Sequence, residues 1–175
     1  MVYAFEPSPR IQAHLVRNLK INTLTNVTVE RIAFADHDGR ASLTGASATN
    51  EGTGSIIGSL DQPSVGGEEV RVMKLDDYVS TKNIERIRLL KIDVEGAEMM
   101  VLRGAQRMLR NRRCQYVLIE VNDSDLRTIG SSASEVFEFL RKCGYRLYRI
   151  GLFGLEPLLP QESVIEANIL AKAAK

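Results

Sequence analysis

The stretch Leu89-Leu90-Lys91-Ile92-Asp93-Val94-Glu95-Gly96-Ala97-Glu98 decides the fold of this 175-residue chain. Its apolar residues form the near-continuous run that is expected of a strand covered on both faces. The run ends at a carboxylate, Asp93, and turns at once into a helix. Ligands of open α/β sheets bind outside the carboxyl ends of the strands. We therefore expect Asp93 to lie beside a bound small molecule.

Composition restricts the class of protein. The hydrophobic share of 44% and the charged share of 26% are typical of a globular protein, and the length fits a single domain over residues 1–175. The net charge of +1 argues against a nucleic-acid binder. Cys114 and Cys143 show neither metal-ligand nor disulfide spacing, which favours a reducing compartment. No stretch approaches the ~20 apolar residues of a membrane span. The start carries no signal-peptide pattern, so we expect a cytoplasmic protein.

Strand and helix patterns alternate along the chain. The sequence predicts strands over 2–6, 27–35, 40–43, 70–75, 89–92, 116–121, 145–150 and 165–171, and helices over 9–21, 75–79, 97–112 and 133–143. For the first helix, Ser8 is the expected N-cap and Pro9 the first residue, and Ile11, Leu15 and Leu19 mark the expected buried stripe. This alternation predicts an α/β fold with a mainly parallel sheet and helices on both faces. Residues 45–67 carry six glycines among 23 residues, which indicates a long flexible loop.

Three predicted strands end at an acid: Glu6, Asp93 and Glu120. If the strands are parallel, these acids share one edge of the sheet. An acid at the end of a strand beside a nucleotide accepts hydrogen bonds from both ribose hydroxyls, which gives Glu6 a functional interpretation. A solvated acid at a strand terminus is the alternative, and this feature alone leaves both open.

Lys91 and Asp93 lie two residues apart in a strand, so their side chains point to the same face. If they were buried, each would favour the charged form of the other. Lys91 has a second candidate partner in Glu120 on a neighbouring strand. A structural ion pair and a catalytic pair both agree with this spacing.

Glu95 and Glu98 fall at the start of a helix, where acids interact favourably with the helix dipole and cap free amides. This structural role is favoured for Glu98, and it competes evenly with a functional role for Glu95. Gly104 lies inside a predicted helix, where glycine costs ~1 kcal/mol relative to alanine. We therefore expect close packing of the helix on the sheet at Gly104. His14 and His37 are expected at the surface.

The chain resembles the FkbM family of methyltransferases from Val2 to about Ala171. Order and spacing both match in Ala4-Phe5-Glu6-Pro7, Asn26-Val27, Ala33, Leu75-Asp76-Asp77, Lys91 to Glu98, Val101-Leu102-Arg103-Gly104-Ala105 and Glu120. The resemblance implies the Rossmann-like fold of class I methyltransferases. It also implies transfer of a methyl group from S-adenosylmethionine to a hydroxyl of a sugar, polyketide or similar small molecule.

The family pattern implies a role for several residues toward the cofactor. Glu6 would bind the ribose hydroxyls of S-adenosylmethionine, and Pro7 and Ala33 would lie near the adenine. Asp93 would face the methionine end of the cofactor and the acceptor.

The same resemblance implies roles in the reaction. Lys91 or Glu95 would orient or deprotonate the acceptor hydroxyl, because positioning and proton removal are what the protein contributes. We expect a site without metal. A divalent ion on Asp93, Glu120 and Asn122 is the less favoured alternative.

One departure from the family pattern concerns the first strand. The family begins earlier, with a strand and a turn of the type Asp-x-Gly-Ala-Asn-x-Gly that cradles the methionine part of the cofactor. Met1 falls inside what corresponds to the second strand. A sheet without its middle strand must leave a gap or close up, and unpaired buried backbone groups are costly. We therefore expect no gap.

Three explanations of this departure are open: a fragment, which we favour, a degenerate paralogue, or a partner chain that supplies the strand. The main alternative to an enzyme is a non-catalytic remnant that binds a partner. An enzyme dependent on a nicotinamide cofactor is disfavoured, because the run from Lys91 to Glu98 has no place in a dinucleotide fingerprint.

Overall fold

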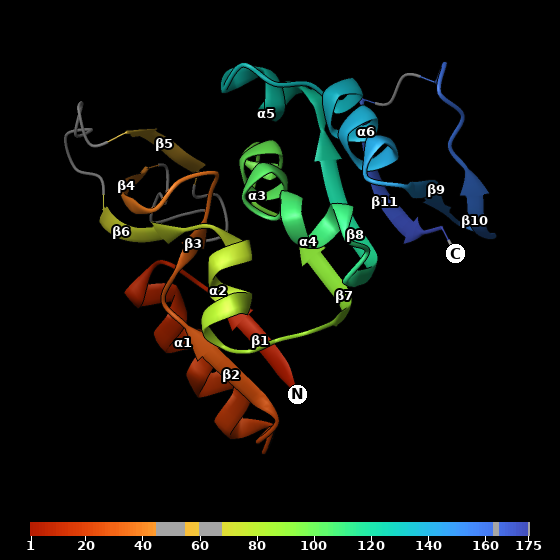
Figure 1. Cartoon of the computed structure of the whole chain (residues 1–175). Helices are drawn as coiled ribbons and strands as arrows, with labels where there is room; N and C mark the ends of the chain where they lie inside the picture. Colours follow the sequence, from red (N-terminus) through yellow and green to blue (C-terminus); the bar gives the residue numbers. More distant parts are fainter. Residues whose placement is uncertain (45–54, 60–67, 163–164, 175) are drawn as a thin grey trace.

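The computed structural model describes residues 1–44, 55–59, 68–162 and 165–174. Its elements in chain order are β1 (Val2–Phe5), α1 (Pro9–Ile21), β2 (Val27–Glu30), β3 (Ala33–Phe34), β4 (Gly39–Thr44), β5 (Ser55–Ser59), β6 (Glu68–Met73), α2 (Leu75–Thr81), β7 (Ile87–Ile92), α3 (Glu98–Gly104), α4 (Gln106–Arg110), β8 (Cys114–Asn122), α5 (Asp123–Thr128), α6 (Ala133–Lys142), β9 (Tyr145–Gly151), β10 (Gly154–Pro157) and β11 (Glu166–Ala173). Figure 1 shows the arrangement, which confirms the α/β class.

The largest sheet has the strand order β10-β9-β11-β8-β7. Only β7 and β8 are parallel within it, and β11 pairs antiparallel with both β8 and β9. Helices α3, α4 and α6 lie on one face (Figure 1). The core between them contains the fully buried side chains Leu102, Leu109, Ile119, Leu140 and Ile169. These side chains belong to one continuous apolar cluster, which also includes Phe34, Leu75 and Tyr78.

The chain contains two smaller sheets. β1 and β2 form a parallel pair, and β3-β6-β4-β5 form a mixed sheet. The stretch 45–67, expected to be one long loop, contains β5, while 45–54 and 60–67 lie outside the described residues. In the described residues three strand pairings are parallel and five are antiparallel, so the sheets are more mixed than the predicted mainly parallel arrangement.

Helix α1 lies against the β1–β2 pair and has the predicted limits, with Pro9 as its first residue. The predicted buried stripe of Ile11, Leu15 and Leu19 is only half-buried, and no residue of α1 is buried. The prediction of a buried stripe is therefore wrong. The described residues place no further element over this helix face.

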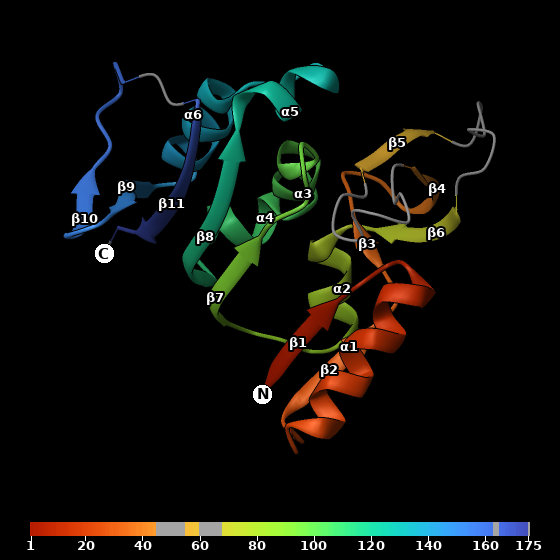
Figure 2. The same ribbon diagram turned by 180° about the vertical axis from the view of Figure 1, so that it is seen from behind.

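β1 and β7 are not paired with each other in the described residues, although their arrows point the same way in Figure 2. The space between them, here called the β1–β7 slot, is part of a hollow of about 1130 Å³ that also extends over residues of β8, β9, β10 and β11. The expectation of no gap is therefore not met in the described residues. Solvent reaches the slot, since Val2 is 50% and Leu89 51% exposed, so water can satisfy the free backbone groups. The same exposure contradicts the prediction that the Leu89 strand is covered on both faces.

Aromatic packing on α2 joins the β1–β2 pair to the rest of the chain. The Tyr78 ring lies 6.1 Å from the ring of Tyr3, 5.0 Å from that of Phe5 and 5.7 Å from that of Phe34, in edge-to-face geometry. The Tyr78 hydroxyl donates to Glu30 Oε1 at 3.1 Å. Such aromatic pairs contribute about 0.5–1.5 kcal/mol each beyond the area they bury.

The predicted helix 97–112 is two helices, α3 and α4, which meet at Ala105. Gly104 ends α3 against the backbone: a Cβ there would overlap the carbonyl oxygen of Ala35 and approach the Cα of Lys74. This contact confirms that close packing requires a glycine. Asp76 fixes the start of α4, since its carboxylate accepts from the N–H groups of Arg107 and Met108, each at 2.8 Å.

We predict that Gly104→Ala destabilises the fold by at least the ~1–3 kcal/mol of an overpacked core, because backbone of Ala35 must move. The free energy of unfolding in urea measures the loss. Gly151→Ala is the matched control, since its new Cβ meets only the flexible Glu156 carboxylate at 2.9 Å. Equal stability of the two variants would contradict the packing argument.

Candidate functional site

The candidate site lies where β1 and β7 end. Glu6 follows β1 and Asp93 follows β7, and the two strands run in the same direction on either side of the slot (Figure 2). Glu6 and Asp93 therefore follow strands that point the same way but belong to different sheets, so a shared edge for the two acids stays a prediction. Glu120 belongs to β8, the parallel neighbour of β7, and lies near the end of that strand.

Glu6 sits in a small polar network. Its Oε1 accepts a hydrogen bond from the Ser8 N–H at 2.9 Å, and the Ser8 hydroxyl donates to Glu68 Oε2 at 2.9 Å. Burial raises the pKa of Glu6, the Ser8 N–H opposes this rise, and the Glu68 carboxylate adds to it. Ser8 is the N-cap residue of α1, as predicted, but its hydroxyl binds Glu68 instead of the helix. Ser8 thus binds one carboxylate oxygen of Glu6 through its backbone N–H.

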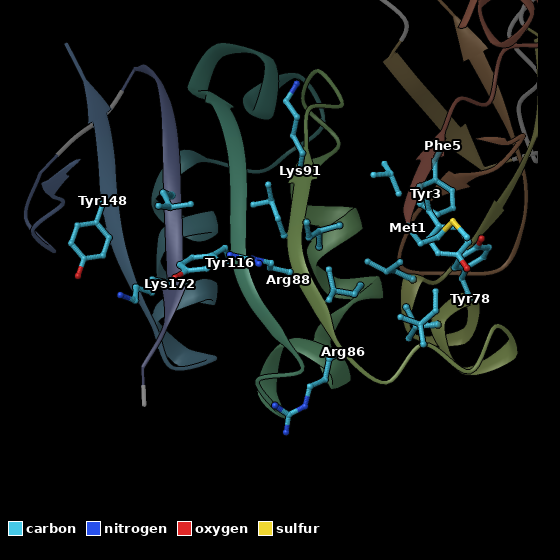
Figure 3. Close-up of a pocket in the computed structure, with 18 of the residues that line it drawn as sticks. Met1, Tyr3, Phe5, Tyr78, Arg86, Arg88, Lys91, Tyr116, Tyr148 and Lys172 are labelled. Carbon is cyan, nitrogen blue, oxygen red and sulfur yellow. The ribbon is translucent and has the colours of Figure 1, made fainter. Parts of the chain in front are cut away.

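Lys91 and Asp93 form an ion pair, with Lys91 Nζ 2.7 Å from Asp93 Oδ2. Their side chains are 58% and 41% exposed, so this is a surface pair and not a buried one. Lys91 pairs with Asp93 and not with Glu120. An exposed pair of this kind contributes at most ~1 kcal/mol to stability. In Figure 3 Lys91 points away from the aromatic side of the slot.

The turn after Asp93 is tightly constrained. Glu95 has φ 47° and Gly96 φ 101°, both in the left-handed region. A Cβ at Gly96 would lie 2.8 Å from the carbonyl oxygen of Asp125, so only glycine fits there. A non-glycine residue in this conformation costs of order 1–3 kcal/mol and is typical of functional sites. Burial raises the pKa of Glu95, and the carboxylates of Asp125, Asp93 and Glu120 raise it further.

Glu98 stabilises this turn through a hydrogen bond to its backbone. It is 3% exposed and begins α3, which agrees with the predicted helix-start role. Its Oε1 accepts from the Gly96 N–H at 3.1 Å, and its Oε2 has no hydrogen-bond partner among the described residues. Burial raises the pKa of Glu98, although backbone N–H groups of Glu98, Gly96 and Val94 oppose the rise. Glu98 therefore positions the turn that carries Glu95.

The remaining predicted residues divide into two groups. Ala33 is buried in the core of the mixed sheet, and Pro7 is half-buried beside Glu6, so their place near an adenine stays a prediction. Asn122 caps α5: its Oδ1 accepts from the Ser124 N–H at 3.0 Å and from the Ser124 hydroxyl at 2.8 Å. The sequence analysis missed Asp125, whose backbone meets Gly96. Only the fold brings these two segments together.

Residues 1–147 match the family model described as "Methyltransferase FkbM domain". The chain belongs to the FkbM methyltransferase family. The resemblance drawn from the motif around Asp93 is thereby confirmed.

Two curated relatives carry methyltransferase names. "2-O-methyltransferase NoeI" of Sinorhizobium fredii is 27% identical over 71% of this chain and 55% of its own length. "Methyltransferase 1" of Beauveria bassiana is 29% identical over 59% of this chain and 48% of its own length. The chain thus spans about half the length of the curated relatives it matches.

A solved FkbM methyltransferase from Methylobacillus flagellatus KT has the same fold, with a TM-score of 0.58 and 17% identity. The match covers 97% of this chain and 36% of the solved one. In the described residues, no helix combines the length and the hydropathy needed to cross a bilayer.

We predict that Glu98 makes the fold less stable as pH rises. Its folded pKa lies above the ordinary value of 4.5, so the folded chain binds more protons than the unfolded chain between these two pKa values. Stability is therefore lost as pH rises through that window. Urea unfolding at about pH 5 and at about pH 8 measures the free energy of unfolding. Its decrease between the two pH values should be smaller for Glu98→Gln than for the wild type.

Glu138→Gln is the control for this comparison. The pKa of Glu138 is lowered by its exposed contact with Lys142, so its carboxylate is ionised at both pH values. The free energy of unfolding of this variant should decrease between the two pH values by the same amount as in the wild type. An unchanged decline in Glu98→Gln would contradict the assignment to Glu98.

Proposed function

We propose that this chain contributes to transfer of a methyl group from S-adenosylmethionine to a hydroxyl of a sugar or similar small molecule. The observation that carries the proposal is the placement of Glu6 and Asp93, both in family motifs, after strands that point the same way on either side of the slot. Acids at the carboxyl ends of neighbouring strands are where an α/β sheet binds a nucleotide-like ligand.

The residues after β1 and β7 offer carboxylates that can bind the ribose hydroxyls and the positive charge of the cofactor. Glu6 offers a carboxylate oxygen to the ribose hydroxyls, since Ser8 N–H occupies only one of its two oxygens. Glu95, Asp93, Glu120 and Asp125 place several acids close together, and their mutual repulsion is relieved by a cationic ligand. The Gly-rich turn that the family resemblance implies for the methionine part does not occur in residues 1–175.

When bound, S-adenosylmethionine supplies a methyl group that is already electrophilic. The protein then needs to align the acceptor hydroxyl and remove its proton. Lys91 is a cation paired with Asp93, so it carries no lone pair to accept a proton. Glu95 has a raised pKa and lies in the strained turn, which makes it the better base. We assign proton removal to Glu95 and alignment of the acceptor to Asp93.

A non-catalytic role is the second candidate. The observation that favours it is the open slot between β1 and β7. Incubation of the protein with isotope-labelled S-adenosylmethionine and a panel of sugars and other hydroxylated molecules separates the two. Label in an acceptor supports the enzyme, and its absence with all acceptors supports the non-catalytic role.

We predict that Glu6→Gln weakens binding of S-adenosylhomocysteine about 10–100-fold, the equivalent of ~1.5–3 kcal/mol for hydrogen bonds to a charged group. Calorimetric titration measures the change. Glu85→Gln is the matched control, because Glu85 precedes β7 at the opposite end of the slot. Equal affinity of the Glu6 variant and the wild type would remove Glu6 from the site.

We predict that Glu95→Gln lowers kcat about 10²–10⁴-fold, the usual contribution of a general base, and leaves KM for the acceptor nearly unchanged. Lys91→Met is the matched comparison, and it should reduce kcat less. A larger loss of kcat in Lys91→Met than in Glu95→Gln would contradict the assignment of Glu95 as the base. Circular dichroism checks that both variants fold.

A further inference from the structure

Ser8 joins two acids that lie far apart in the sequence. Its N–H donates to Glu6 Oε1 at 2.9 Å, and its hydroxyl donates to Glu68 Oε2, 60 residues further along the chain, at 2.9 Å. Glu6 follows β1 of the β1–β2 pair, and Glu68 is the first residue of β6 in the mixed sheet. Only the fold therefore brings Glu68 to the residue that binds Glu6.

The hydroxyl of Ser8 binds Glu68 in place of its own helix. A serine at the N-cap usually accepts a hydrogen bond from an N–H of the first helical turn. The Ser8 side chain makes no such bond. Ser8 is 3% exposed, and a buried hydroxyl without a partner is costly. The bond to Glu68 therefore determines how the Ser8 side chain is held.

The three polar groups of Ser8 have partners from different segments. The N–H meets Glu6, the hydroxyl meets Glu68, and the backbone oxygen accepts from the Gln12 N–H at 2.8 Å. The Glu6 backbone is held separately, since its N–H donates to the backbone oxygen of Glu30 at 3.1 Å. The bond to Glu30 thus places the Glu6 backbone, and Ser8 orients the Glu6 carboxylate.

We propose that Glu68 is a positioning residue for the cofactor site: it holds the Ser8 hydroxyl, and Ser8 in turn holds the Glu6 carboxylate in place for the ribose hydroxyls of S-adenosylmethionine. This inference rests on the proposed function for the ligand of Glu6. It adds to that function a residue that acts through Ser8 and not by contact with the reacting atoms.

Glu68 acts on Glu6 through two opposing effects. Its hydrogen bond with Ser8 keeps the N–H donor beside Glu6, which favours the ionised Glu6, whereas its own negative charge favours the protonated form. In the wild type, burial raises the pKa of Glu6, the Ser8 N–H lowers it and the Glu68 carboxylate raises it. Two variants separate these effects. Ser8→Ala loses the hydroxyl and keeps the charge of Glu68, while Glu68→Gln loses the charge and keeps an oxygen that accepts from Ser8.

Carbon-13 NMR titration of the Glu6 carboxyl in the ligand-free 175-residue chain is the first test. The Glu6 resonance is the one that is absent in Glu6→Gln. We expect the pKa of Glu6 to rise in Ser8→Ala, because the N–H is released, and to fall in Glu68→Gln, because the repulsion is removed. Glu69→Gln is the matched control, since Glu69 is the next residue of β6 and its side chain points to the other face and binds Arg40. The pKa of Glu6 should stay at its wild-type value in this control.

Glu68→Met repeats the test without a change at Ser8. Glu68→Met and Glu68→Gln both lack the charge, and only the methionine lacks an oxygen to accept from Ser8. The pKa of Glu6 should therefore be higher in Glu68→Met than in Glu68→Gln. Circular dichroism checks that each variant folds, and this pair carries the test if Ser8→Ala does not fold.

Calorimetric titration with S-adenosylhomocysteine is the second test. Glu68→Met should weaken binding about 3–10-fold at about pH 8, the effect of one lost hydrogen bond. Glu68→Gln should bind as the wild type does at this pH, and it should keep its affinity to lower pH because its Glu6 stays ionised there. Glu69→Met is the control and should bind as the wild type does.

Several results would overturn the proposal. They are a pKa of Glu6 that is the same in Glu68→Met and Glu68→Gln, a change of this pKa in the same direction in Ser8→Ala and Glu68→Gln, or an equal loss of affinity in Glu68→Met and Glu69→Met. If the wild type binds no S-adenosylhomocysteine, the proposed function fails. The NMR titration needs no ligand, so it then still decides whether Glu68 positions Glu6.

Discussion

The packing of Tyr78 against Tyr3, Phe5 and Phe34 is the interaction on which the rest of the structure depends. β1 and β7 share no pairing in the described residues, so side-chain contacts through α2 place the β1–β2 pair beside the larger sheet. The Tyr78 hydroxyl and Lys82 Nζ both donate to Glu30, which ties α2 to the end of β2. Burial, followed by the Glu30 carboxylate, raises the pKa of Tyr78, so its hydroxyl stays a donor.

This arrangement explains how β1 and β7 are positioned although they are not paired with each other in the described residues. Tyr78 sets the position of β1, and β1 sets that of Glu6. The larger sheet sets the position of β7, and Gly96 and Glu98 then shape the turn that follows Asp93. The acids therefore follow strands of two separately packed units.

Local signals predicted most elements and the edge of the site. Ser8 and Pro9 marked the start of α1, Gly104 marked the close packing, and acids after apolar runs located the ends of β1 and β7. Sequence could not show that β11 pairs antiparallel with β8 and β9, because strand order depends on contacts between distant segments. It also missed α5, a short helix. The exposure of Lys91 and Asp93 depends on what covers β7, which no local pattern contains.

The separation of β1 and β7 is the most direct test of this account. Paired strands lie about 4.7–4.9 Å apart, within the ~7 Å Cα limit of a disulfide, whereas β1 and β7 are unpaired and the slot lies between them. Val2→Cys with Leu89→Cys, both lining the slot, should therefore give no disulfide under mild oxidation. Leu155→Cys with Ile150→Cys, antiparallel partners, should cross-link. A high-yield disulfide between positions 2 and 89 would show that the sheet closes up and would contradict the account.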